Sequence, residues 1–119
     1  MSSSTAHQID PQAIDALRES MGSDDEVAEL VEIFREQAER DIAAMHAAWP
    51  EAPEALGRLA HRLKGSSLSM GAYALAEQCR RLEQRAGGGL ADSETASLLS
   101  AVEDTYLRAS EALRGLVRR

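Results

Sequence analysis

The sequence has little cysteine, few aromatic residues and no long hydrophobic run. Cys79 is the only cysteine among 119 residues, so no internal disulfide can form and the cysteine spacings of metal fingers are absent. No apolar run approaches the roughly 18 residues that a membrane-spanning helix needs. The polar start lacks the basic and then apolar composition of a signal peptide. We therefore expect a soluble cytoplasmic protein.

The composition favours helices in one small domain. Aromatic residues make up 3% of the chain and β-branched residues are few, whereas Ala, Leu, Glu and Arg dominate. A chain of this length can bury one core but cannot also hold a nucleotide-binding fold. The formal net charge of −7 argues against non-specific nucleic-acid binding.

Hydrophobic periodicity predicts one short and four long amphipathic helices. The short helix begins at Pro11, after Asp10 as N-cap, and ends before Gly22. The long helices are expected at about residues 23–48, 54–69, 72–86 and 93–116. Short loops make neighbouring helices antiparallel. We predict an all-α, up-down four-helix bundle with an additional short N-terminal helix, as a single domain over residues 10–117 that follows a flexible segment, 1–9.

The helix expected at residues 54–69 carries a histidine on its outer face. On a helical wheel of about 100° per residue, an apolar stripe clusters within about 60° of Leu56. His61 falls at about 140°, away from that stripe. The stripe consists of Leu56, Leu59, Ala60, Leu63 and Ser67.

Two glycines flank this histidine at one helical turn on each side. A glycine inside a helix costs about 1 kcal/mol relative to alanine, so Gly57 and Gly65 call for a reason. Our interpretation is clearance, because without side chains at these positions another protein can approach the His61 imidazole closely.

Further residues on this side of the bundle suit a docking surface. Leu68 is expected as an exposed apolar contact on the His61 face, and Ile33 lies off the apolar stripe of its own helix. Arg58 and Arg62 lie further round the helix and would attract an acidic partner.

An exposed imidazole beside a lysine suits the holding of a phosphoryl group. Near neutral pH a largely uncharged histidine offers a ring nitrogen as nucleophile. Lys64, the only lysine in the chain, is the i+3 neighbour of His61 and can offset charge on phosphoryl oxygens.

The imidazole also needs a group that fixes its tautomer. In an antiparallel hairpin that pivots near Ala72, position 61 faces roughly position 83. We expect Glu83 to bind the Nδ1 side of His61 and to leave Nε2 free for attack on phosphorus. A register shift of one turn leaves two substitutes, Gln84 and Gln37.

The segment from Ala60 to Ser67, followed by Met70-Gly71-Ala72, resembles the signature of the histidine-phosphotransfer (Hpt) domain family. The resemblance extends from about Ile9 to Leu116. It implies a phosphorelay intermediate in two-component signal transduction, which carries a phosphoryl group from an aspartate of one receiver domain to an aspartate of another. The partners that it implies are response-regulator receiver domains and a hybrid sensor histidine kinase. It also implies His61 as phosphoacceptor, assisted by Lys64 and made accessible by Gly65. Arg62 departs from the small or polar residue that members often carry there.

Other functions remain open at this point. A non-phosphorylated helical adaptor that docks on receiver domains is the alternative, and a hydrolase is a third hypothesis, although no complete set of acid, base and nucleophile is apparent. We expect a monomeric phosphocarrier that is not an enzyme, with no ATP site, cofactor, metal, nucleic-acid or membrane partner. His46 is expected to be structural or at the surface, and His7 idle. The start at Met1 favours a free-standing protein over a fragment of a larger kinase.

Overall fold

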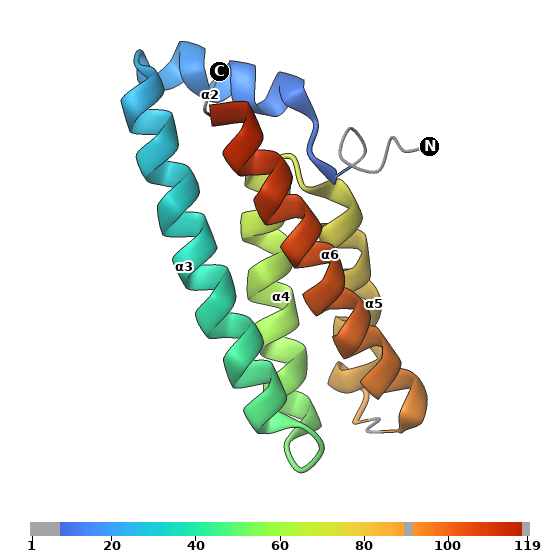
Figure 1. The fold of residues 1–119 in the computed structure, drawn as a ribbon. Helices are drawn as coiled ribbons and strands as arrows, with labels where there is room; N and C mark the ends of the chain where they lie inside the picture. Colours follow the sequence, from blue (N-terminus) through green and yellow to red (C-terminus); the bar gives the residue numbers. More distant parts are fainter. Residues whose placement is uncertain (1–7, 90–91, 118–119) are drawn as a thin grey trace.

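The computed structural model describes residues 8–89 and 92–117, which form helices without any strand (Figure 1). The helices are α2 (Pro11–Met21), α3 (Asp24–Ala48), α4 (Pro53–Ser69), α5 (Tyr73–Gly87) and α6 (Ser93–Val117). The predicted all-α class and the predicted helices are confirmed, with boundaries that differ by one or two residues. No helix in the described ranges is both long and apolar enough to cross a membrane.

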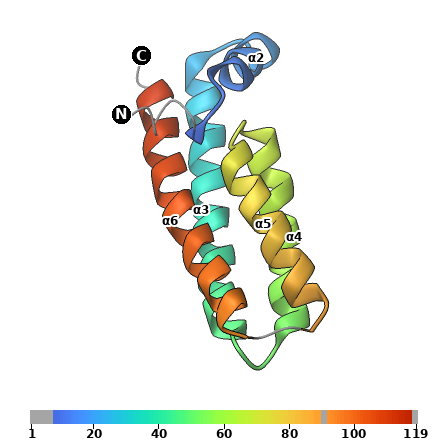
Figure 2. The same ribbon diagram turned by 90° about the vertical axis from the view of Figure 1, so that its right-hand side faces the viewer.

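The four long helices form an antiparallel up-down bundle, as the short loops predict. Helices α3 and α6 lie in one layer and α4 and α5 in the other, and α2 crosses one end of the bundle (Figures 1 and 2). Consecutive helices alternate in direction along the bundle axis. The α4–α5 hairpin therefore forms one outer face of the molecule and the α3–α6 pair the opposite one.

Local sequence signals explain where the first helices begin and end. Asp10 accepts a hydrogen bond from the backbone N–H of Gln12, and the Ser23 hydroxyl accepts one from the N–H of Glu26. Between them, Gly22 ends α2 with a φ of 87°, in the left-handed region that favours glycine. Pro53 begins α4, where the missing N–H of a proline costs nothing.

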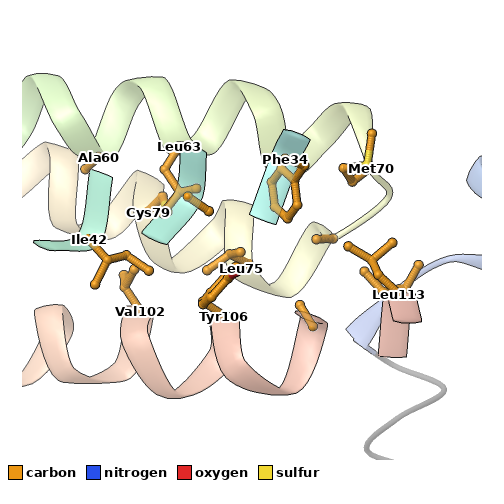
Figure 3. Packing of buried hydrophobic residues seen from close by; sticks show 14 of the residues in the cluster. Phe34, Ile42, Ala60, Leu63, Met70, Leu75, Cys79, Val102, Tyr106 and Leu113 are labelled. Atoms are coloured by element: carbon orange, nitrogen blue, oxygen red, sulfur yellow. The ribbon is translucent and has the colours of Figure 1, made fainter. Parts of the chain in front are cut away.

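The predicted apolar stripes meet in one core (Figure 3). The stripe of α3 is largely buried, and α4 buries four of the five residues that the helical wheel placed inward, whereas Leu59 is only partly buried. Tyr106 of α6 is 2% exposed and packs against Phe34, with the ring centroids 6.3 Å apart. The fully buried side chains of α4 and α5 include Leu56, Ala60, Leu63, Leu75, Cys79 and Leu82.

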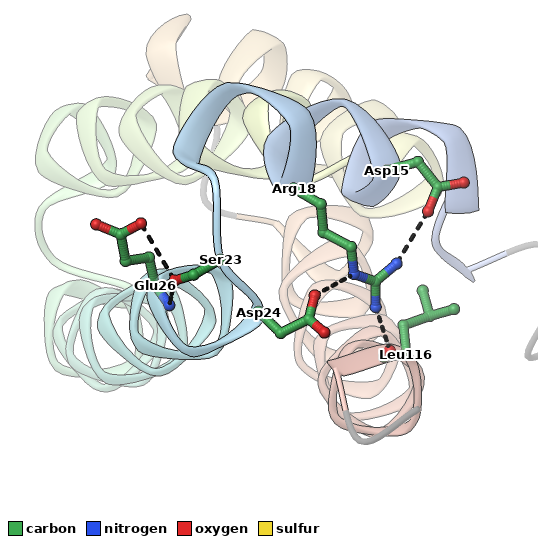
Figure 4. A network of polar contacts seen from close by, with 6 residues as sticks. All are labelled: Asp15, Arg18, Ser23, Asp24, Glu26 and Leu116. Atoms are coloured by element: carbon green, nitrogen blue, oxygen red, sulfur yellow. Dashed lines mark hydrogen bonds and ion pairs between the residues drawn. The ribbon is translucent and has the colours of Figure 1, made fainter.

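Helix α2 is fastened to the end of the bundle by Arg18 (Figure 4). Its guanidinium donates to the backbone oxygen of Leu116 at 2.7 Å, to Asp15 at 2.9 Å and to Asp24 at 3.1 Å. This one side chain therefore ties the start of α3 and the end of α6 to α2.

The same helix also fixes the turn between α4 and α5. The N–H of Asp10 donates to the carbonyl of Gly71 at 3.0 Å, and a Cβ at Gly71 would lie 2.6 Å from the Cβ of Ala13. Gly71 has a φ of 75°, so both its conformation and this close approach require glycine. The α4–α5 hairpin thus has a fixed pivot.

The prediction that residues 1–9 are flexible is wrong for the last two of them, Gln8 and Ile9. Ile9 is 2% exposed and belongs to the hydrophobic core, and Gln8 is 9% exposed. Burial of this apolar side chain in the core is favourable and holds the residue before the first N-cap in place. The rest of that segment, including His7, lies outside the described residues.

Candidate functional site

Helix α4 presents His61 to solvent on the outer face of the α4–α5 layer. The side chain is 66% exposed, whereas Leu56, Ala60 and Leu63 of the same helix are fully buried. The 3.6-residue period explains this placement, because His61 lies on the side of α4 away from the buried stripe.

Glu83 of α5 lies against His61, as the hairpin register predicts. One oxygen of its carboxylate, Oε2, is 2.8 Å from His61 Nδ1, and the other, Oε1, accepts a hydrogen bond from Lys64 Nζ at 3.0 Å. The two substitutes that the sequence left open bind other groups: Gln37 donates to Asp41, and Gln84 accepts from Arg80.

The electrostatics of this triad define which ring nitrogen is available. Lys64, above all, and then His61 lower the pKa of Glu83, although its partial burial acts in the opposite direction. Glu83 is therefore a carboxylate that can only accept, and the neutral His61 ring must carry its proton on Nδ1. Nε2 is left with its lone pair and faces no described partner.

Gly65 leaves the surface beside His61 open. A Cβ built at Gly65 would meet nothing within 4 Å, so no packing contact inside the chain demands a glycine there. An ordinary side chain at this exposed position would instead project into the space beside the imidazole. The structure is thus consistent with the clearance expected of Gly65.

Gly57 has a different role from the one expected, and this corrects our interpretation. It is buried, and a Cβ there would lie 3.0 Å from the backbone N and 3.1 Å from the Cα of Gly87 in α5. The absent side chain lets α4 and α5 approach each other, so its primary role is helix packing and not partner access. A helical wheel shows the direction of a residue but not the distance to the next helix.

An open groove adjoins His61 at this glycine contact. It has a volume of about 630 Å³ and includes Arg58, which is exposed. The residues that line the groove are Glu54, Gly57, Arg58, His61, Glu83 and Gly87.

Arg62 points to a buried carboxylate that sequence reasoning missed. Its Nη2 is 2.6 Å and its Nε 3.2 Å from Oδ1 of Asp41, which is 1% exposed and also accepts from Gln37. This pairing explains how α3 tolerates an acid on its apolar stripe. The sequence did hold a signal for this buried acid, because Asp41 lies three residues after Ala38 and therefore on the apolar stripe of α3. Arg62 is therefore committed within the chain, although its side chain is 61% exposed.

The two predicted apolar docking residues are at the surface. Ile33 is 60% exposed and Leu68 50% exposed, and Tyr73 at the start of α5, which we had not singled out, is also 50% exposed. A shallow hollow beside Lys64 is lined by both Leu68 and Tyr73. Ile33 lines a second hollow, between α3 and α4.

Other reactive side chains form no comparable site. His46 Nε2 lies 2.9 Å from Glu103 on the opposite face of the bundle. Cys79 is buried, and its burial raises the pKa of the thiol to about 12. In the described part of the chain, no group of three or more His, Cys, Asp or Glu residues is arranged to hold a metal ion.

The sequence model of the Hpt domain matches residues 29–114, most of the chain. The chain belongs to the Hpt domain family. No curated protein and no solved structure matches the chain. Membership in the Hpt family implies histidine phosphotransfer in a phosphorelay, and the matched residues include all of α4 and α5, with His61, Lys64 and Glu83.

Proposed function

We propose that this Hpt domain relays a phosphoryl group between aspartates of receiver domains through Nε2 of His61. The observation that carries the proposal is the Nδ1–Glu83 contact of 2.8 Å, which directs the lone pair of an exposed ring to the solvent side. The receiver domains belong to response regulators and to a hybrid sensor histidine kinase, and we place the exchange in the cytoplasm.

The forward step forms one bond and breaks one. The Nε2 lone pair attacks the phosphorus of a receiver's aspartyl phosphate, and the P–O bond breaks with its electron pair going to the aspartate carboxylate. The ring becomes a cation that carries the phosphoryl group on Nε2 and the proton on Nδ1. Glu83 stabilises that cation, because its negatively charged carboxylate accepts a hydrogen bond from the Nδ1–H group of the ring. Transfer to a second aspartate is the reverse of this step.

Lys64 is the phosphate-charge partner in this proposal. In the structure its ammonium is held beside the ring by Glu83, with the side chain 27% exposed. A partly exposed cation on a flexible stem can turn from Glu83 to a phosphoryl oxygen as negative charge arrives on Nε2.

Docking of the receiver uses the exposed apolar residues around the site. Ile33, Leu68 and Tyr73 offer contact area beside the C-terminal half of α4, and burial of such area drives association. Arg58 adds positive charge that attracts an acidic partner, whereas the charge of Arg62 is largely offset by Asp41. A non-phosphorylated adaptor would use the same surface, but it has no need for the His61–Lys64–Glu83 contacts.

The experiment is phosphotransfer from a receiver domain that carries labelled aspartyl phosphate. We expect acid-labile, alkali-stable label on the chain, complete loss of that label in His61→Gln and normal labelling in the matched control His46→Gln. Binding without transfer from any receiver of the same cell would favour the adaptor. Label acquired from ATP alone, without a partner, would favour an enzyme.

A further inference from the structure

The groove beside His61 contains an arginine that no other described residue engages. Arg58 is exposed at the wall of this 630 Å³ groove, and among the described residues its guanidinium has no hydrogen-bond or ion-pair partner. The two neighbouring cations differ in this respect, because Lys64 binds Glu83 and Arg62 binds Asp41.

Lys64, the proposed charge partner of the phosphoryl group, is already shared with Glu83. In the structure Lys64 and Glu83 neutralise each other at 3.0 Å, and the positive charge that the ring gains on phosphorylation offsets no more than one charge of the phosphoryl group. A phosphoryl group on Nε2 adds one to two negative charges next to the Glu83 carboxylate. Glu54, the other carboxylate of the groove, lies two helical turns before His61 and therefore repels the phosphoryl group less than Glu83 does.

The helix geometry brings Arg58 within reach of that charge. Residues three apart on a helix have Cβ atoms about 5–6 Å from each other, and helical side chains lean toward the preceding turn, which for His61 contains Arg58. Both residues line the groove. Gly57 and Gly87 contribute no side chains to the groove, so a long side chain can lie across it. A guanidinium presents two parallel donors that match phosphoryl oxygens.

We propose that Arg58 turns into this groove and donates hydrogen bonds to the phosphoryl oxygens on Nε2 of His61. Arg58 approaches from the turn before the histidine, and Lys64 from the turn after it. Arg58 thus contacts the transferred group itself, in addition to any contact with a docked partner. This inference rests on the proposed function, because it requires a phosphoryl group on His61.

The test measures the phosphoryl group directly and needs no partner protein. The chain is phosphorylated with phosphoramidate, and the ³¹P signal of the phosphohistidine is followed against pH. A nearby cation favours the less protonated form of the phosphohistidine, so Arg58→Ala should raise the titration midpoint by about 0.8 pH unit, the size expected for one charge at roughly 4 Å in water. In Arg58→Lys the midpoint should return part of the way to that of the parent chain. Arg114→Ala, which removes an exposed arginine from α6, should leave the midpoint unchanged.

Equal midpoints in Arg58→Ala and the parent chain would overturn the inference. Slower transfer from a receiver, with the midpoint unchanged, would also overturn it, because Arg58 would then act in docking alone. A parent chain that accepts no phosphoryl group at His61 would overturn the proposed function itself. That outcome is distinguishable, because it appears before any arginine is changed.

Discussion

The bundle carries two exposed histidine–glutamate pairs on opposite faces, and only one of them has the features of a phosphotransfer site. His61 pairs with Glu83 across α4 and α5 at 2.8 Å, and His46 pairs with Glu103 across α3 and α6 at 2.9 Å. The side chains of both histidines are accessible, at 66% and 46% exposed. Exposure and a carboxylate partner therefore do not distinguish the two sites.

The ring nitrogen that each carboxylate engages does distinguish them. Glu83 binds Nδ1 of His61, the nitrogen nearer its own backbone, and leaves the outer Nε2 free. Glu103 binds Nε2 of His46, so the outer nitrogen of that ring is occupied. In the described part of the chain, Lys64 also contacts Glu83, whereas no lysine or arginine contacts Glu103. The comparison shows that the two histidines differ in the ring nitrogen that is left free, and this difference separates the proposed nucleophile from the other histidine.

The largest effect is expected where α4 and α5 touch. Gly57→Ala adds a Cβ 3.0 Å from the Gly87 backbone, so the two helices must separate. We expect a loss of about 1–3 kcal/mol in unfolding free energy, typical of overpacking. Denaturant unfolding measures the loss, and NMR of the two histidine rings should show a perturbed His61 and an unperturbed His46.

Gly65→Ala is the matched control and should be neutral or stabilising by up to about 1 kcal/mol. A destabilised Gly65→Ala beside an unaffected Gly57→Ala would reverse our assignment of the two glycines.

A side chain at Gly65 should slow transfer without harm to the fold. In Gly65→Gln we expect helix content to be kept or raised, and the rate of transfer from a phosphorylated receiver to fall by about tenfold, since loss of roughly 1.4 kcal/mol in the encounter gives that factor. Gly115→Gln is the matched control, because a Cβ at Gly115 of α6 also meets nothing within 4 Å. Equal transfer rates in the two variants would remove the argument from clearance.

Removal of the Lys64 ammonium should have a smaller effect. In Lys64→Ala we expect transfer to slow about fivefold with the fold unchanged, because a partly exposed charge contact is worth roughly 1 kcal/mol. Arg114→Ala controls for the loss of one positive charge. A transfer rate equal to that of the parent would mean that the lysine is only a surface charge.

The smallest effect concerns pH. The pKa of Glu83 is lowered from its ordinary value of 4.5, foremost by Lys64, so its contacts stabilise the fold above that value and are lost as pH falls through the lowered pKa. Glu83→Gln should therefore cost about 0.5 kcal/mol of unfolding free energy at neutral pH and nothing in strong acid. Urea unfolding at several pH values measures this difference. A cost that persists unchanged in acid would show that the charge of Glu83 is irrelevant to stability.

The periodicity of the sequence was enough to predict the bundle and the exposure of His61. The turn near Ala72 was enough to pair position 61 with position 83 to within one helical turn. Only the contacts in the structure select Glu83 over Gln84 and Gln37. The role of Gly57 was not predictable, since helical periodicity gives no distance between helices. The Arg62–Asp41 pair was missed because the proline-containing connection between α3 and α4, residues 49–52, gives no tight turn from which the register of these two helices can be read. Long-range polar contacts of this kind depend on how the helices pack.

The most direct test of the account is a heteronuclear NMR measurement on the phosphorylated chain, which identifies the histidine and the ring nitrogen that carry phosphorus. We predict a phosphoryl group on Nε2 of His61, with the proton of that ring on Nδ1 and His46 unmodified. A phosphoryl group on Nδ1 of His61, or on either nitrogen of His46, would contradict the claim that the Glu83 contact selects the nucleophile.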